Sequence, residues 1–464
     1  MRTKKTKQNH LFASDSVMKT VLKLAIPTVV GQIILVIYNI ADTYFVSLTG
    51  RDDCISAVTV CLPAFMFLSA ISNLFGIGAS STIGRAMGRG KIRRARRTAA
   101  FSFWGCFVTT CFYSLLALLL IHPFVRILGG LEENVHALAV SYMEVTVVIG
   151  GLFASLNALM AHLFRSEGRS IISAIGISLG GFLNIALDPL FMFVLLPEGA
   201  EVLGAAVATT LANALSFFYF LIVFLRLRRK KTVLSLKISA RRVRKIFKKH
   251  IPKDVLAAGL PACLMTLFEN VSYGVLGNLM AHVSVAAHAG IGVAKKVNML
   301  AHCIVRGIAQ GVLPLIAYHH AAKDRRRMQH SFFVSMALAV GAAALCTAGC
   351  LIFSMQLTGI FFPGVSESHS LAAKFLRILC IGGPFSACAY LMISFFQAVG
   401  QGLRSFFLAV LRKGALDIPM MLLFASVFSA SMIVWATPFA DMICCLTALL
   451  MFFLFRRKQL AKAA

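Results

Sequence analysis

Long apolar segments alternate with short polar ones along the whole chain of 464 residues. A helix needs about 20 mostly apolar residues to cross a bilayer, because unpaired backbone amides are too costly in hydrocarbon. Segments of this kind predict twelve transmembrane helices, at residues 24–48, 55–84, 99–122, 136–163, 170–197, 201–225, 256–281, 285–318, 330–354, 369–398, 403–428 and 430–455. The predicted fold class is therefore an all-α integral membrane protein.

The composition favours the same class. Hydrophobic residues make up 59% of the chain and charged residues 14%, with a mean hydropathy of +0.83. A soluble domain carries about 25% charged residues, so lipid is the expected solvent for most of this surface. The first residues are polar and basic and lead directly into a full-length span, so no cleaved signal peptide is predicted.

The net charge of +29 would also suit a nucleic-acid-binding protein. The positions of the basic residues distinguish that class from a membrane protein. Most Lys and Arg lie at the termini or after even-numbered spans, as in residues 89–97 and 226–253. This positive-inside pattern predicts a multi-pass membrane protein with both termini in the cytoplasm. Segment 226–253 is expected to contact anionic lipids, since it has too few aromatic residues to stack on nucleic acid.

The two halves of the chain repeat each other at an offset of about 230 residues, as expected for two parallel transporter lobes. Pro27 corresponds to Pro261, and the LDP at Asp188 corresponds to the LDIP at Asp417. Both halves hold six spans, so they are expected to be related by an axis along the membrane normal. The predicted organisation is a cytoplasmic segment at 1–23, a six-helix lobe at 24–225, a basic cytoplasmic linker at 226–255, a second six-helix lobe at 256–455 and a cytoplasmic tail at 456–464.

Five strings in this order resemble multidrug and toxic compound extrusion (MATE) proteins: YNIADTYFV (38–46), FRSEGRSIISAIGISLGGFLNIALDPL (164–190), LGAAVAT (203–209), QGVLPLIAYHHAAK (310–323) and FFQAVGQGLRSFFLAVLRKGALDIP (395–419). The resemblance implies a V-shaped pair of six-helix lobes that exports amphipathic, often cationic, drugs or toxins in exchange for protons or sodium ions. A monomer is expected. The chain departs from the family at His319, His320 and Ala321, which replace polar and glycine positions.

Carboxylates inside predicted spans are functional candidates, because a charged group at mid-bilayer costs several kcal/mol. Asp42 and Asp188 are such acids, and Asn184 lies one helical turn before Asp188. The resemblance implies that Asp42, Asn184, Asp188 and Thr209 form a site for H+ or Na+. Alternatively, Asp42 ends a helix, Asp188 caps a break before Pro189, and Thr209 bonds its own helix.

A second group of candidates lies in the C-terminal half. Glu269 stands where some MATE branches have a coupling glutamate, but residues 381–396 lack the aspartate that those branches also use. Asp417 is a candidate partner acid, or it pairs with Arg412 or Lys413. Lys295 and Lys296 either neutralise Glu269, face a cavity or extend toward an interface. Lys296 and Tyr38 complete the secondary and substrate-binding candidates.

Other classes of protein are less well supported by the sequence. An integral-membrane enzyme is disfavoured, because HExxH, GxSxG, P-loop and clustered-His motifs are absent from the sequence. The twelve Cys show no metal-ligand spacing, so neither a cofactor nor a metal other than a coupling Na+ is predicted. A lipid-linked precursor flippase of the same superfamily remains the alternative function, although such proteins resemble this chain less in span number and in the acidic first lobe. A passive channel also remains open.

Overall fold

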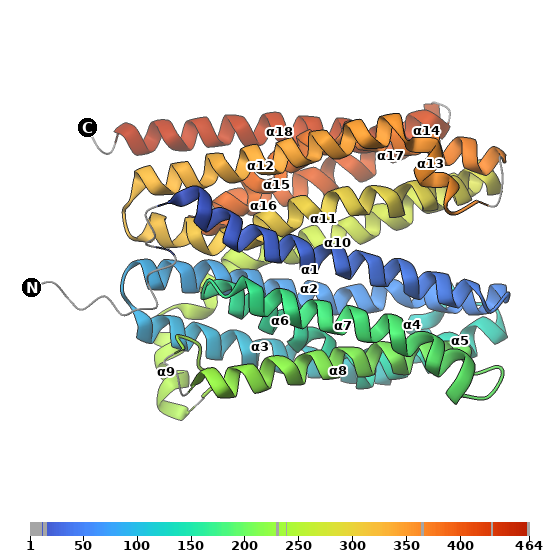
Figure 1. The fold of residues 1–464 in the computed structure, drawn as a ribbon, viewed down its shortest axis with the longest axis horizontal. Helices are drawn as coiled ribbons and strands as arrows, with labels where there is room; N and C mark the ends of the chain where they lie inside the picture. Colours follow the sequence, from blue (N-terminus) through green and yellow to red (C-terminus); the bar gives the residue numbers. More distant parts are fainter. Residues whose placement is uncertain are drawn as a thin grey trace, which may run out of the picture. The chain divides into compact units, whose positions relative to one another are not determined.

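The fold is an array of long helices (Figure 1). The computed structural model describes residues 12, 16–228, 232–237, 239–362, 366–427 and 430–461, and no strand occurs among them. The basic KKTK at residues 4–7 lies outside this described part. The prediction of an all-α membrane protein is confirmed.

The N-terminal half is built of α-helices, two of which run into π-helical turns. The elements are α1 (Val17–Ser47), α2 (Asp52–Gly88), α3 (Ile92–Leu119), α4 (Ile121–Ile127), α5 (Glu133–Met143), the π-helical turn η2 (Glu144–Ile149), α6 (Gly151–Ser166), α7 (Ser170–Leu190), the π-helical turn η3 (Phe191–Leu195) and α8 (Glu201–Arg228).

The C-terminal half follows a short amphipathic helix in the basic linker. The elements are α9 (Ala240–Lys248), α10 (Ile251–Val283), α11 (Val285–Ala321), α12 (Arg325–Ile352), α13 (Ser354–Gly359), α14 (Glu367–Ile381), α15 (Gly383–Ala398), α16 (Gly402–Val410), the π-helical turn η4 (Leu411–Asp417), α17 (Ile418–Val427) and α18 (Ala430–Ala461).

Eleven of the twelve predicted spans have the length and composition of membrane helices. In the described residues, nine single helices are long and apolar enough to cross a membrane, and two bent pairs of helices are so when each pair is taken as one span. The pairs are Glu133–Ile149 with Gly151–Ser166, bent by 48°, and Glu367–Ile381 with Gly383–Ala398, bent by 45°. The twelfth prediction, 403–428, is helical through α16, η4 and α17. It carries four charged side chains, which explains its weaker apolar character.

The chain divides into two compact units, each with its own core. One unit comprises Met1–Val29 and Leu267–Ala464, and the other comprises Val30–Thr266. The divisions fall within α1 and α10. The lobe limits at 24–225 and 256–455 stay a prediction.

Glycines explain why α1 and α10 are each divided between units. In the Val30–Thr266 unit, a Cβ added to Gly259 of α10 would lie 1.8 Å from the backbone oxygen of Leu74 in α2. In the other unit, a Cβ on Gly311 of α11 would lie 2.8 Å from the backbone oxygen of Leu24 in α1. Only glycine permits such close approach of backbones, as is usual between membrane helices. The first part of α10 therefore packs on α2, and the first part of α1 packs on α11.

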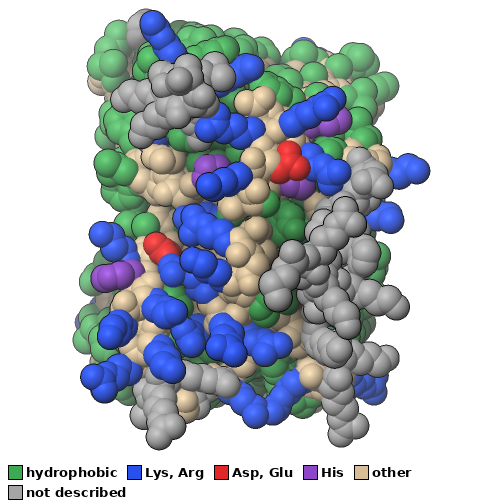
Figure 2. Space-filling view, turned by 90° about the vertical axis from the view of Figure 1, so that its left-hand side faces the viewer, with side chains coloured by type: hydrophobic (Ala, Val, Ile, Leu, Met, Phe, Trp, Pro, Cys, Tyr) green, Lys and Arg blue, Asp and Glu red, His purple; other side chains and the backbone are tan. Residues whose placement is uncertain are grey.

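Basic side chains gather at the end of the molecule where α2 turns into α3 (Figure 2). Arg89, Lys91, Arg93 and Arg96 of this turn are exposed, as are the basic side chains of α9, namely Arg244, Lys245 and Lys248. The short linker segment 232–237 is hydrogen-bonded to Glu167, the residue after the end of α6. Glu167 accepts hydrogen bonds from Thr232 Oγ1 at 2.6 Å and from the Leu234 amide at 2.9 Å.

Candidate cation site

Two neighbouring helices of the Val30–Thr266 unit bring the first candidates together. Tyr38 and Asp42 lie one turn apart on α1, and α7 presents Gly181 on the facing side. A Cβ added to Gly181 would lie 2.8 Å from Ile34 Cγ2 and 3.4 Å from Tyr38 Cδ1. The missing side chain therefore allows α1, which carries Asp42, to lie directly against α7, which carries Asp188.

Asn184 is the central hydrogen-bond donor of this site. Its Nδ2 donates to Asp188 Oδ1 at 3.1 Å and to Thr209 Oγ1 on α8, also at 3.1 Å. Asp188 is completely buried, and Asn184 and Thr209 are nearly so. The helical spacing thus predicted the contact within α7, while the contact with α8 depends on the packing of the two helices.

The acids of the site have no basic partner among the described residues. Neither Asp42 nor Asp188 forms a salt bridge in the described part of the chain. Asp42 Oδ1, Asn184 Oδ1 and Asp188 Oδ2 are buried without a hydrogen-bond partner among the described residues. Unpaired charge in a medium of low dielectric constant is costly. The site can lower that cost by taking up a proton or a small cation with its oxygen atoms.

The helix backbone is irregular next to Asp188. Pro189 follows directly and has no N–H to donate to the preceding turn, and the π-helical turn η3 begins two residues later. Such π-helical turns occur often at functional sites. The helix can therefore change shape near the acid more easily than a regular α-helix.

The C-terminal candidates belong to the other unit and have basic partners. Glu269 Oε2 accepts a hydrogen bond from Arg306 at 2.9 Å, and both side chains are partly exposed. The alternative in which a lysine neutralises Glu269 is therefore wrong. Lys295 is buried instead, donates from Nζ to the backbone oxygen of Tyr273 at 2.9 Å, and lies 4.1 Å from the centre of that ring. Lys296 is partly buried.

Asp417 is completely buried and fully hydrogen-bonded. It accepts hydrogen bonds from Lys413 Nζ at 2.8 Å, Ser272 Oγ at 2.7 Å and Thr437 Oγ1 at 2.9 Å. Lys413 is therefore its basic partner, and Arg412 is not. Unlike Asp188, this acid has no free oxygen for an additional ion.

A second buried ion pair was missed by sequence reasoning. Arg412 Nε donates to Asp441 Oδ1 at 2.7 Å, and the two side chains are 1% and 3% exposed. Arg412 also donates to Ser386 Oγ at 2.6 Å. The sequence contained one signal for Asp441. ATPFAD (436–441) is the repeat counterpart of ATTLAN (208–213), and in this alignment Asp441 corresponds to the polar residue Asn213.

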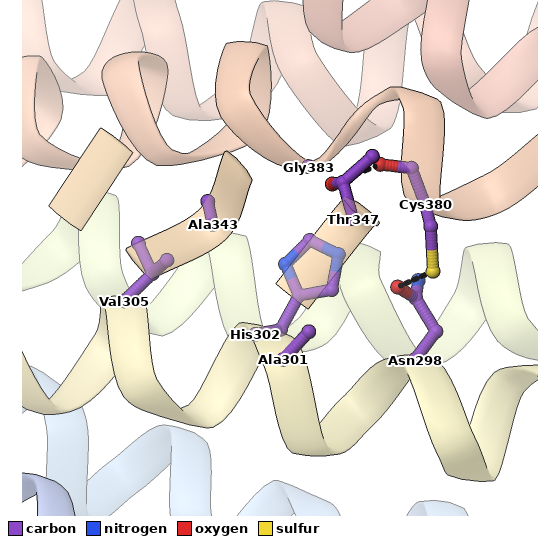
Figure 3. Close-up of a pocket in the computed structure, with 8 residues that line it drawn as sticks. All are labelled: Asn298, Ala301, His302, Val305, Ala343, Thr347, Cys380 and Gly383. Atoms are coloured by element: carbon purple, nitrogen blue, oxygen red, sulfur yellow. Dashed lines mark hydrogen bonds between the residues drawn. The ribbon is translucent and has the colours of Figure 1, made fainter. Parts of the chain in front are cut away.

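A small cavity adjoins this network (Figure 3). It has a volume of about 10 Å³ and is lined by Asn298, Ala301, His302, Val305, Ala343, Thr347, Cys380 and Gly383. His302 Nδ1 lies 3.4 Å from Ser386 Oγ, the hydroxyl that also binds Arg412. The cavity has room for about one water molecule and is far smaller than a drug-binding pocket.

Known proteins resemble the chain over nearly its full length. The sequence profile of the MatE family matches residues 27–190 and 261–423, and these matches begin at the two corresponding prolines. The multidrug export protein MepA of Staphylococcus saprophyticus subsp. saprophyticus is 29% identical over 452 residues, which is 97% of each chain. MepA of Staphylococcus aureus (strain NCTC 8325 / PS 47) is 27% identical over the same length.

Solved structures share the fold at lower sequence identity. A crystal structure of MATE in complex with MaL6 has a TM-score of 0.87 and 23% identity, covering 98% of this chain and 99% of the other. An outward-facing multidrug resistance MATE family transporter of the MOP superfamily has a TM-score of 0.86 and 22% identity, covering 99% of each chain. A MOP superfamily transporter from Pyrococcus furiosus, described as having a binding pocket of reverse polarity, has a TM-score of 0.84 and 22% identity, also covering 99% of each chain.

Proposed function

The chain belongs to the MatE family of multidrug and toxic compound extrusion transporters, and from this premise we propose that it exports amphipathic, cationic small molecules in exchange for H+ or Na+. The name of its relative MepA, a multidrug export protein, supports the substrate class. The observation that carries the proposal is a pair of acids, Asp42 and Asp188, without a basic partner in the described residues. Asp188 is completely buried, and Asp42 is partly buried with its Oδ1 oxygen enclosed. The family consists of transporters, so no enzymatic activity is assigned.

The coupling site comprises Asp42, Asn184, Asp188 and Thr209. The acids supply the negative charge, while Asn184 orients one oxygen of Asp188. A proton or sodium ion bound between the carboxylates removes charge that would otherwise attract the exported cation. Export and ion entry are then coupled, because the two cations compete for the same negative charge.

The C-terminal candidates have a lesser role in this proposal. Glu269 already has Arg306 as a partner at 2.9 Å, so it modulates substrate preference instead of driving transport. Tyr38 lies beside the coupling site and offers an aromatic surface to a lipophilic cation. Lys296 is partly buried and disfavours cations near it.

The membrane orientation follows from the basic residues. We place the protein in the bacterial inner membrane, as a monomer with both termini in the cytoplasm. The exposed Arg and Lys of the α2–α3 turn and of α9 then face the cytoplasm and contact anionic lipids. No role in nucleic-acid binding is proposed.

The alternative function as a lipid-linked precursor flippase requires basic groups free to hold a diphosphate. In the unit that contains Leu267–Ala464, Arg306, Arg412 and Lys413 each pair with a carboxylate. This pairing favours export of cations over transfer of an anionic lipid precursor.

The test is transport by the purified full chain in proteoliposomes. A fluorescent lipophilic cation is loaded, and a proton or a sodium gradient is imposed separately. Uphill transport that follows one gradient supports the proposal and identifies the ion. Transport that only follows the gradient of the dye would indicate a passive channel, and transport of lipid-linked precursors alone would indicate the flippase.

A further inference from the structure

The surroundings of Asp417 repeat those of Asp188, although the two acids lie in different units. Each aspartate is closely followed by a proline, Pro189 or Pro419. A π-helical turn lies near each acid, although Asp417 is the last residue of η4 whereas η3 begins three residues after Asp188. Each also accepts a hydrogen bond from the side chain four residues earlier. Asn184 donates at 3.1 Å in the first case, whereas Lys413 donates at 2.8 Å in the second.

A threonine from a later helix completes both arrangements. Thr209 is the second residue of ATTLAN (208–213) on α8, and Thr437 is the second residue of ATPFAD (436–441) on α18. Thr209 Oγ1 lies 3.1 Å from the donating amide of Asn184, and Thr437 Oγ1 donates to Asp417 Oδ1 at 2.9 Å. The two sites therefore use the same elements of the repeat.

The first helix of each half contributes in the same register. Ser272 follows Pro261 by as many residues as Tyr38 follows Pro27. The hydroxyl of Ser272 donates to Asp417 Oδ2 at 2.7 Å. The same register matches Asp42 with Leu276, which is 1% exposed within an apolar cluster. The repeat has thus kept one acid of the pair and replaced the other with leucine.

The charges differ in a simple way. The first site holds two acids that have no basic partner in the part of the chain that the structure describes. The second site holds one acid and the ammonium of Lys413, whose side chain is 9% exposed. An ammonium is a compact single positive charge with three donors. It donates three hydrogen bonds as a hydronium ion does, and it carries the same charge as Na+. In the second site, both carboxylate oxygens already have partners.

We propose that Asp417 marks a second copy of the cation site, in which the ammonium of Lys413 permanently takes the place of the monovalent ion. This inference rests on the proposed function, because it takes the Asp188 site as the one that binds H+ or Na+. It follows that the chain has one exchangeable ion site, and that replacing Lys413 with a neutral side chain opens a second.

Buried ion pairs are poor evidence of stabilisation, because apolar pairs of similar volume often stabilise a fold as well. Helical pairs four residues apart are ordinary on exposed surfaces, but this pair is buried and also holds Ser272 and Thr437. The partners Ser272, Lys413 and Thr437 occupy the repeat positions of Tyr38, Asn184 and Thr209 in the first site, whereas a simple helix-stabilising pair accounts only for the contact with Lys413.

The experiment measures cation uptake by the purified full chain in detergent, starting from Asp188→Asn so that the first site is disabled. Retention of radioactive Na+ and the infrared signal of a protonated carboxyl group report the two possible ions. Adding Lys413→Asn should restore uptake of one cation per chain, through either reporter. Lys413→Arg, which keeps the positive charge, is the matched control and should restore nothing. Adding Asp417→Asn to the Lys413→Asn chain should abolish the gain.

The inference is overturned if Lys413→Asn gains neither signal, or if Lys413→Arg gains the same signal. Should the Lys413→Asn chain be too unstable to purify, the reciprocal change Asn184→Lys in the otherwise natural chain decides. In the natural protein, binding of Na+ or of a proton should raise the melting temperature. Asn184→Lys should place an ammonium beside Asp188 and remove that rise; persistence of the rise in this variant overturns the inference.

Failure of the proposed function has a different signature. It would appear in Asp188→Asn alone, as cation uptake equal to that of the natural chain. The gain from Lys413→Asn is measured against that single variant and is therefore judged separately.

Discussion

Asn184 donates to Asp188 across one turn of α7 at 3.1 Å, while the second carboxylate oxygen of Asp188 is buried without a partner in the described residues. One oxygen is thus fixed in orientation and the other is available to a ligand. A site for a small cation needs both features, because ordered oxygen atoms must replace its hydration shell.

Asn184→Ala should weaken coupled export by about tenfold without abolishing it, the scale expected when a group that orients a ligand is removed. The change removes the donor to Asp188 and Thr209 but leaves both acids. Asn157→Ala is the matched control, since Asn157 belongs to the same unit and bonds to Asn213 and Ser216. Initial export rates in proteoliposomes check the prediction, and equal losses in the two variants would contradict it.

Glu269→Gln should change substrate preference and leave gradient-driven export. The loss of its charge releases Arg306, which is partly exposed and should then disfavour cationic substrates. Export rates for a panel of cationic and zwitterionic dyes provide the measurement. Arg306→Gln should shift substrate preference in the opposite direction. Complete loss of coupled export in a well-expressed Glu269→Gln protein would contradict the prediction, because it would locate the main coupling site in the C-terminal half.

Breaking the buried pair of Arg412 and Asp441 should destabilise the protein strongly. Removal of one member of such a pair costs about 3–5 kcal/mol, because the other charge stays buried. Asp441→Leu should therefore lower the melting temperature in detergent, and adding Arg412→Met should recover most of the loss. A double variant less stable than Asp441→Leu would argue against this interpretation.

The topology can be tested by labelling single cysteines in a background without the natural ones. Position 240 should react with an impermeant reagent only from the cytoplasmic side, and positions 52 and 133 only from outside. Asp52 is exposed at the start of α2, and Glu133 is exposed at the start of α5. Labelling of position 240 from outside would contradict the proposed orientation.

The sequence predicted the helices well because membrane spans leave a strong hydropathy signal. The predicted spans 136–163 and 369–398 are bent by 48° and 45°, at glycine and proline positions that permit a helix to bend. The spacing of four residues on one helix correctly predicted that Asn184 lies beside Asp188, because this relationship depends only on local helix geometry.

Partners from distant segments were harder to predict. The pairing of Glu269 with Arg306 and of Arg412 with Asp441 depends on how α10, α11, η4 and α18 pack, and neither hydropathy nor spacing contains that information. The repeat is the exception, because a comparison of ATTLAN with ATPFAD draws attention to Thr437 and Asp441 from the amino-acid sequence alone.

The central claim is that Asp42 and Asp188 act as one coupling unit. Asp42→Asn, Asp188→Asn and the double variant should be compared in proteoliposomes under an imposed proton gradient and, separately, a sodium gradient. Each single change keeps the side-chain shape but removes a charge, so each should reduce gradient-driven export of a lipophilic cation to the level of empty liposomes. The double variant should be no worse than either single one, because groups that act as a unit are not additive. Normal export by either single variant, with unchanged dependence on both gradients, would contradict the account.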